Sequence, residues 1–401
     1  MNRRSLHALA VALAAALALA MPGTAHAQGG GKTPDPRPFA LFRDLFDTAG
    51  EFHGPWVTMT WQPQMQYQWQ SQGAPKNNVQ PTVSWQAYTW FTPELTMNVN
   101  LALNQPGNGP VANATNGDWL AYGMAGQAGD VWLQWSDQRT GIIGGRYTAP
   151  FGIAPLVLPG VFDTNLVGNY NFGGLLGGLG TLSTGDEGLG IHALNVGFFG
   201  IDTTFMANNI FLSTPTPTGP GTGGGVDSWV IGYAAENVPL LFPTLEWNIG
   251  YIQFGDGNGA PENQKGFNAG AYWQYIVDND GSDTLDAQYW SIGPLVEYVR
   301  FWNNNGVADA DAEYFTVGLV SNYGNWQTDF TWGYQSLTGS GQPNQRTDLF
   351  TANLGYNFFG PQSLVQVGYA YQDTEGQGVN HQVGLQVNFP ITILEWTPFW
   401  N

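Results

Sequence analysis

The stretch VTMTWQPQMQYQWQ, residues 57–70, alternates large apolar side chains with polar, uncharged ones. A period of two places the two sets on opposite faces of a β-strand. The polar set consists of threonine and glutamine, whereas a sheet face exposed to bulk water normally carries Lys and Glu. The pattern therefore predicts a strand with one face in lipid and the other in a water-filled interior. Pro63 interrupts the run and predicts a bulge or an edge irregularity there.

The same alternation recurs along the chain, in segments that approach the roughly 9–11 residues a tilted membrane strand needs. These segments are residues 95–103, 245–251, 326–335, 350–358 and 382–389. Charged residues make up 10% of the chain, less than half the share of about a quarter usual in soluble domains. No stretch after residue 27 is apolar enough for a membrane helix. We therefore expect an all-β fold, a transmembrane antiparallel β-barrel.

Connection lengths predict the number of strands, because bacterial barrels alternate short periplasmic turns with long external loops. Short connections are expected at residues 92–94, 137–141, 200–202, 322–325 and 359–363, and long ones at 71–80, 105–127, 153–187, 213–227, 255–266, 303–313, 336–348 and 373–380. This alternation gives 16 strands, with one long loop, 153–187, folded inward. An 18-strand barrel, with residues 391–400 as an added strand, is the alternative. Aromatic residues near the strand ends are candidate girdles at the two membrane surfaces.

The N-terminus predicts export. Arg3 and Arg4 precede an apolar run from Leu6 to Met21, and Ala25-His26-Ala27 offers small residues at a cleavage site. This is the layout of a signal peptide, residues 1–27. Residues 28–54 are expected to form a lead containing at most a short helix, and residues 55–401 the barrel. The formal charge of −19 disfavours a nucleic-acid partner.

The segment GGRYTAPFG, residues 144–152, resembles an element of phosphate-selective porins and of siderophore porins of the legiobactin-receptor type. The resemblance implies a member of the bacterial outer-membrane porin superfamily. In such proteins the element ends the strand before a long loop that folds into the channel, which would here be residues 153–187. The substrate does not transfer, because 11 basic residues are too few for the cationic lining of a phosphate-selective channel.

Candidate pore-lining residues are those that alternate with the apolar, lipid-facing positions of each strand. Arg146 and Thr148 are expected to point into the lumen, opposite acids of the following loop, where opposed charges would orient solutes. Further acids on the lumen parity would favour cations. Two alternatives stay open: Arg146 ties the loop to the wall, and the acids are satisfied by neighbouring hydroxyls and amides. The full set is Arg146, Thr148, Asp163, Asp186, Glu187, Glu246, Glu297 and Asp329.

These features predict a passive aqueous diffusion channel for small hydrophilic solutes, favouring cations. The alternative is a channel specific for an iron-siderophore or a small apolar compound, shaped by the Gly-rich residues 172–182. An enzyme is not expected, because no G-x-S-x-G motif and no metal-type histidine pair is present. No cofactor or metal is expected. The expected partners are outer-membrane lipids, small solutes or ions, the barrel-assembly machinery and two further copies in a homotrimer.

Overall fold

The computed structural model describes residues 55–72, 77–104, 119–120, 125–137, 139–186, 189–204, 218–238, 245–278, 290–339, 344–358 and 363–396. The predicted signal peptide, the lead 28–54 and Glu187 lie outside these ranges. The strands are β1 (Trp56–Gln70), β2 (Asn77–Trp90), β3 (Leu95–Asn104), β4 (Trp119–Leu120), β5 (Ala125–Ser136), β6 (Thr140–Tyr147), β7 (Leu175–Asp186), β8 (Gly190–Ile201), β9 (Ser228–Glu236), β10 (Leu245–Gln253), β11 (Lys265–Trp273), β12 (Tyr275–Asp278), β13 (Trp290–Trp302), β14 (Asp311–Tyr323), β15 (Trp326–Thr338), β16 (Gln345–Asn357), β17 (Leu364–Thr374), β18 (Gly378–Asn388) and β19 (Ile391–Trp396). The short helices are α3 (Ala154–Val157), α4 (Thr164–Val167), η2 (Gly168–Tyr170) and η3 (Asn304–Gly306). No helix within these ranges is long and apolar enough to cross a membrane.

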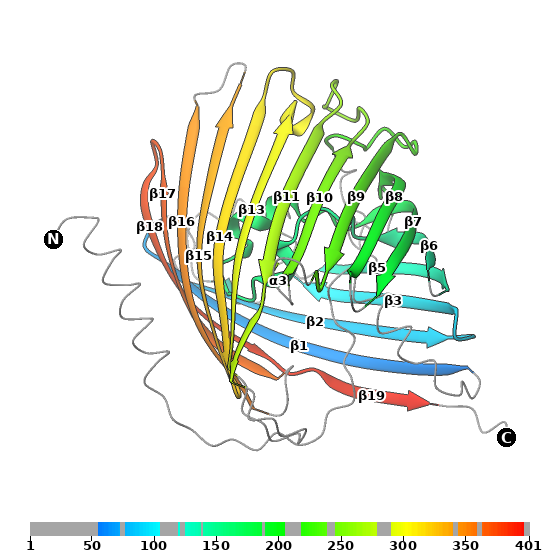
Figure 1. Ribbon diagram of the computed structural model, residues 1–401. Helices are drawn as coiled ribbons and strands as arrows, with labels where there is room; N and C mark the ends of the chain where they lie inside the picture. The colour runs from blue at the N-terminus through cyan, green and yellow to red at the C-terminus, as the bar shows by residue number, and fades with distance from the viewer. Residues whose placement is uncertain are drawn as a thin grey trace.

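The strands close into one barrel (Figure 1). Neighbours along the chain pair antiparallel, and β1 pairs with β18 and β19 on the side away from β2. β11 and β12 pair successively with β13 and form one strand of the wall, as β18 and β19 do against β1. β4 is a two-residue segment lying parallel to β2. Among the described residues the barrel therefore has 16 strands, as predicted.

The 18-strand alternative is wrong. Residues 391–396 do not add a strand; they continue the last one beyond Pro390 and pair with the first residues of β1. A register shift between Met59 and Thr60 marks the irregularity along this seam. The bulge predicted near Pro63 is absent from the β1–β2 pairing, where Pro63 lies opposite Val83 in regular register.

The two faces of the barrel differ as the sequence pattern predicts. Large apolar side chains stand exposed on the outer face, among them Met65 at 54%, Ile142 at 55% and Phe198 at 59%. The inner face is identified by Glu297 and Asn353, which contact the segment folded into the barrel. In β15 to β18 the inward positions carry mostly threonine, asparagine, glutamine and glycine. The β1 parity assignment, apolar outward and glutamine inward, is confirmed.

Two connections were predicted wrongly. Residues 175–186 are not part of the long loop but form β7, which pairs with β8 along its whole length and with β6 over residues 175–182. Their inward residues are Leu175, Gly177, Leu179 and Thr181. Apolar and polar residues therefore do not alternate along this strand, and its high glycine content is typical of a loop. Residues 200–202 are consequently not a short turn. They end β8, at the same end of the barrel as the segment between β6 and β7.

The two ends of the barrel differ in their connections. The strand pairs β2–β3, β5–β6, β7–β8 and β14–β15 follow one another within a few residues at one end, which we call the turn end; the opposite end is the loop end. Asp137 shows how such a turn is closed: its Oδ1 accepts the backbone N–H groups of Arg139 and Thr140, both at 2.7 Å. These two bonds hold the pKa of the exposed Asp137 carboxyl below its usual range.

The topology can be tested by thiol labelling, since the chain has no cysteine. A membrane-impermeant maleimide applied to intact cells should label Gln377→Cys, in the short β17–β18 connection at the loop end, because the end that carries the long loops faces outward in bacterial barrels. Leu189→Cys and Gly324→Cys, at the turn end, should react only after the cells are opened. Labelling of Leu189→Cys on intact cells would contradict the placement of β7 and β8.

Candidate functional site

A segment of the chain, residues 148–174 between β6 and β7, lies inside the barrel (Figure 1). We call it the inward segment. It enters through Gly152, whose φ of +90° favours glycine and where a Cβ would lie a tight 3.3 Å from Glu297 Oε1 and from the Tyr170 ring. Phe162 and Tyr170 within it are fully buried. The predicted inward folding is thus confirmed, for a segment that ends at residue 174 rather than 187.

Glu297 of β13 holds the beginning of the inward segment. Its two carboxylate oxygens accept the backbone N–H groups of Ile153 and Ala154, the latter at 3.2 Å. These N–H groups open α3 and have no partner within so short a helix, so a carboxylate is the matching acceptor. Glu297 is 1% exposed. It therefore anchors the segment and does not face an open passage.

Asp163 and Asp329 hold the middle of the inward segment. Asp163 Oδ2 accepts the N–H of Gly160 at 2.9 Å, and Asp163 Oδ1 accepts the hydroxyl of Thr351 on β16. Asp329 on β15 accepts Asn353 Nδ2 at 2.6 Å, and Asn353 Oδ1 accepts the N–H of Val161 at 3.0 Å. Asp163 is 1% exposed and Asp329 is fully buried. The prediction that these acids form an open charged lining is wrong, because the inward segment covers them.

Glycines on the wall make space for the apolar side chains of the inward segment. A Cβ at Gly384 would lie 2.7 Å from Val161 Cγ1, and one at Gly333 would lie 2.9 Å from Leu166 Cδ1. Leu166, with Phe162 and Val161, joins Leu349 and Ala370 in a buried cluster. The apolar residues of the segment are thus buried within their own barrel.

Arg146 does not point into the lumen as parity suggested. Its register partners are Val131 and Leu176, and Leu176 stands 39% exposed on the outer face. The inner face of β6 is instead apolar, with Ile143 and Tyr147 buried inside. The prediction assumed that polar residues mark the inner face of every strand. On β6 the inner face is apolar, because it packs against the inward segment.

Arg146 acts as a tie between neighbouring parts of the wall. Its Nε is 3.0 Å from Asp202 Oδ2, beyond the end of β8, and its Nη1 donates to the backbone carbonyls of Ala128 and Gly129. Gly145 must be glycine for this path, since φ is +134° and a Cβ would lie 2.4 Å from the Val131 carbonyl oxygen. Arg146 thus forms a salt bridge, but to Asp202 after β8 and not to the long loop that the alternative named.

The remaining predicted residues are not brought together. Thr148 donates its hydroxyl to Asp130, 3.2 Å from each carboxylate oxygen. Asp186 ends β7 at the turn end, far along the strand from Arg146, so the two cannot oppose each other across a passage. Glu246 is a half-buried residue at an inward position of β10, opposite Tyr272.

A continuous surface of side-chain amides covers the inner face of β1, β2, β17 and β18. The register joins residues far apart in sequence: Gln66 lies opposite both Gln80 and Gln386. At the inward positions described in these four strands there is no Asp, Glu, Lys, Arg or His. We call this surface the amide wall; it comprises Gln62, Gln64, Gln66, Gln68, Gln70, Asn78, Gln80, Gln86, Gln366, Gln382, Gln386 and Asn388.

The inward segment meets the amide wall on β17, on β18 and at the middle of β1. Asn165 Nδ2 donates to Gln382 Oε1 at 3.1 Å, and Gln66 Nε2 donates to the Val161 carbonyl at 3.4 Å. Most of the wall stays half-buried rather than fully covered. The sequence alternation predicted the inward glutamines of β1. That they lie beside the amide side chains of β17 and β18 depends on how the barrel closes and could not be predicted.

Aromatic side chains continue the inner face at the turn end. Trp56 and Trp90 are stacked with ring centres 4.4 Å apart, and Tyr88 lies 5.7 Å from Trp90 and 6.3 Å from Trp132. By register all four occupy inward positions. Trp56 and Trp90 are therefore not part of an outer girdle, as their position at strand ends had suggested.

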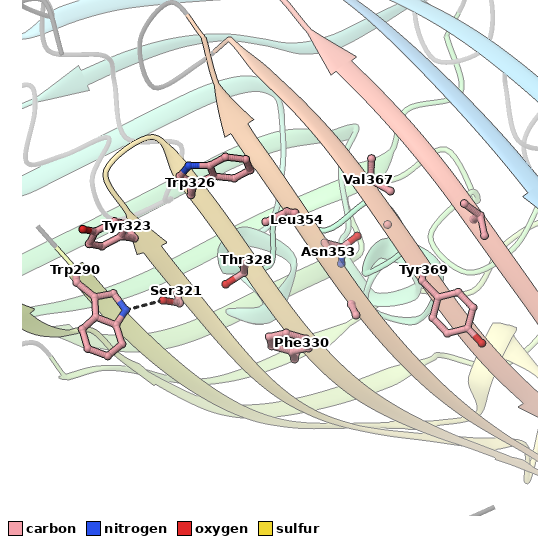
Figure 2. A pocket seen from close by; sticks show the side chains of 13 residues that line it. Trp290, Ser321, Tyr323, Trp326, Thr328, Phe330, Asn353, Leu354, Val367 and Tyr369 are labelled. Carbon is pink, nitrogen blue, oxygen red and sulfur yellow. Dashed lines mark hydrogen bonds between the residues drawn. The ribbon is translucent and has the colours of Figure 1, made fainter. Parts of the chain in front are cut away.

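Figure 2 shows a cavity of about 290 Å³ over strands β13 to β18. Its lining consists mainly of outward residues, including Phe330, Leu354 and Val367, and Trp290 donates its indole N–H to Ser321 at 3.0 Å at one side. The cavity lies on the outer face and not in the interior. Trp290, Trp326 and Phe358 form an aromatic rim on the outer face at the turn end. This rim agrees with the predicted girdle at one membrane surface.

Comparison with known proteins gives a likeness of fold. No protein-family model matches the chain, and no curated protein matches it by sequence. The structure is similar to Pseudomonas putida OprB, with 12% identity, a TM-score of 0.56, and coverage of 87% of this chain and 96% of that one. It is also similar to Pseudomonas aeruginosa OccK1 (OpdK), with 10% identity, a TM-score of 0.52, and coverage of 85% and 99%. At these identities the likeness concerns the barrel fold.

The role of Glu297 as an anchor predicts a stability defect. Glu297→Ala should lower the free energy of unfolding by about 1–3 kcal/mol for each buried N–H left without an acceptor. Glu297→Gln, which keeps one acceptor oxygen, should lose less. Thermal unfolding of the detergent-solubilised barrel measures both. An alanine variant that melts at the temperature of the unaltered protein would refute the anchor.

Proposed function

We propose that the protein is an outer-membrane channel through which small hydrophilic solutes diffuse passively. The closed barrel with an apolar outer face and a polar inner face carries this proposal. The exposed side chains of Ile142, Phe198 and Val367 would promote aggregation in water, but they are suited to contact with lipid. The structural neighbours include an outer-membrane protein, OpdK of Pseudomonas aeruginosa, which has the same fold at 11% identity.

The amide wall indicates the kind of solute. Each primary amide both donates and accepts hydrogen bonds and carries no net charge. A row of them replaces part of the water shell of an uncharged polar solute without holding it as an ion pair would. We propose that the passage runs between the amide wall and the inward segment and that small neutral polar solutes are its main cargo.

The charge of the interior supports a cation preference among ions. No lysine or arginine occupies an inward position in the described strands, while Glu246 does so on β10. The chain as a whole has 30 acidic and 11 basic residues. The preference should be mild, since Glu297, Asp163 and Asp329 are covered. Outer-membrane lipids and the barrel-assembly machinery are the partners this location requires.

A channel specific for a small apolar compound is not supported, because the Gly-rich residues 172–182 do not shape a binding site. Residues 175–182 belong to the wall, and Phe172 packs against Phe151, Phe254 and Phe301 in a filled aromatic cluster. Phe254 and Phe301, which lie near strand ends, belong to this interior cluster and not to an aromatic girdle. The described histidines point to no catalytic site: His192 pairs with Tyr233 at 2.8 Å and His381 with Tyr369 at 2.7 Å, both on the outer face.

Reconstitution tests permeability. Proteoliposomes containing the purified barrel should swell in isotonic solutions of small neutral polyols, and the swelling rate should fall steeply as solute size increases. Replacing residues 156–170 of the inward segment by a short Gly-Ser linker should raise both the swelling rate and the single-channel conductance. A barrel that folds, shown by its circular dichroism, but gives neither swelling nor conductance would refute the channel.

Reversal potentials test selectivity. In a salt gradient the open channel should favour cations, and more strongly near 0.1 M than near 1 M salt because screening shortens the reach of the acids, from about 10 Å to about 3 Å. Gln68→Glu on the amide wall should increase the preference and Gln68→Lys should reverse it. If the two variants shift the reversal potential equally, the amide wall does not line the conducting path.

A further inference from the structure

One hydrogen bond joins a side chain of the inward segment to a side chain of the amide wall. Asn165 Nδ2, in α4, donates to Gln382 Oε1, on β18, at 3.1 Å. Asn165 is exposed and Gln382 is half-buried, so solutes inside the barrel can reach this contact. We call it the amide bridge.

The short helix that carries Asn165 has one apolar face and one polar face. Leu166 and Val167 are buried, and Leu166 packs against Gly333 on β15. Thr164 and Asn165 are exposed. Because the apolar face is held on β15, the polar face turns away from that strand, and Asn165 meets the amide wall.

The amide bridge is not what holds the inward segment in place. Buried hydrogen bonds do so: Glu297 binds the first N–H groups of α3, and Asn353 binds the N–H of Val161. An exposed hydrogen bond between two neutral side chains contributes little to stability, since water can replace either partner. The bridge can therefore open and re-form while the segment stays docked.

The two amides of the bridge determine which solute can replace their bond. A side-chain amide both donates and accepts, and among the described residues neither side chain makes a second hydrogen bond. A solute that separates them must accept from Asn165 and donate to Gln382. A polyol does both through its hydroxyl groups, whereas a solute that can only accept leaves Gln382 Oε1 without a donor.

We infer that the amide bridge is a specificity determinant, which favours polyhydroxylated solutes over neutral solutes of equal size that only accept hydrogen bonds. This inference rests on the proposed channel, whose passage runs between the two elements that the bridge joins. The entering solute replaces the Asn165–Gln382 bond by one bond to each amide, and the bridge re-forms behind it. A solute without a donor is disfavoured because it leaves a polar group of the site unpaired.

Swelling of proteoliposomes tests the amide bridge with two solutes of similar size, the polyol erythritol and the zwitterion glycine betaine, which has no donor. The ratio of the two swelling rates is independent of how much barrel is inserted. Asn165→Leu keeps the size of the side chain and removes its amide, so it should lower the ratio about two- to tenfold, the contribution of one hydrogen bond. Gln382→Leu should lower the ratio to the same extent, and the double variant should lower it no further, because each variant removes the same bridge.

Further variants separate the chemistry of the bridge from its shape. Asn165→Gln retains a side-chain amide and should restore most of the ratio. Gln377→Leu, at an exposed position between β17 and β18, should leave the ratio unchanged. Asn165→Ala and Gln382→Ala replace the leucine variants if these do not fold.

The outcomes distinguish this inference from the channel itself. If the barrels swell in erythritol but the variants at Asn165 and Gln382 keep the ratio of the unaltered protein, the channel stands and the inference is overturned. An unaltered barrel that swells in neither solute would refute both.

Discussion

The pairing of the first strand with the last is the constraint on which the rest of the structure depends. In a bilayer core every backbone N–H and C=O must find a partner within the protein, and only closure removes the two free edges of a sheet. Here β1 is paired along one side with β2 and along the other with β18 and then β19. The strand is interrupted at Pro390. Because proline has no backbone N–H, this interruption leaves no donor of that residue without a partner. Closure also brings together glutamines from opposite ends of the sequence and creates the amide wall.

The interior divides into two parts with different chemistry. On one side, β6, β7 and β13 to β18 receive the inward segment, and their inner positions are shaped for it by glycines, apolar residues and buried acids such as Glu297 and Asp329. On the other side, β1 and β2 keep half-buried amides and aromatic rings. The acids thus contribute to structure, whereas the uncharged side is the part of the wall left for solutes.

The sequence pattern is informative where the inner face is polar and loses its information where that face is apolar. Where the wall is polar inside and apolar outside, as in residues 57–70 and 326–335, alternation predicted both the strand and its orientation. In β6 and β7, which lie behind the inward segment, the inner face is largely apolar too, and the alternation disappears. That is why residues 175–186 resembled a loop and Arg146 was assigned to the wrong face. Glu297 and Asp329 were placed correctly on the inner face, but a single strand pattern carries no information about a segment from elsewhere that covers them.

The glycine at position 384 has a consequence for the order of folding. Val161 and Phe162 of the inward segment pack against it, and it lies on β18, the strand that closes the barrel. Their binding surface is therefore incomplete until the C-terminal strand has paired with β1. During synthesis the inward segment precedes that strand by more than two hundred residues. It must consequently wait undocked while the wall is assembled, and it can settle only as one of the last events of folding.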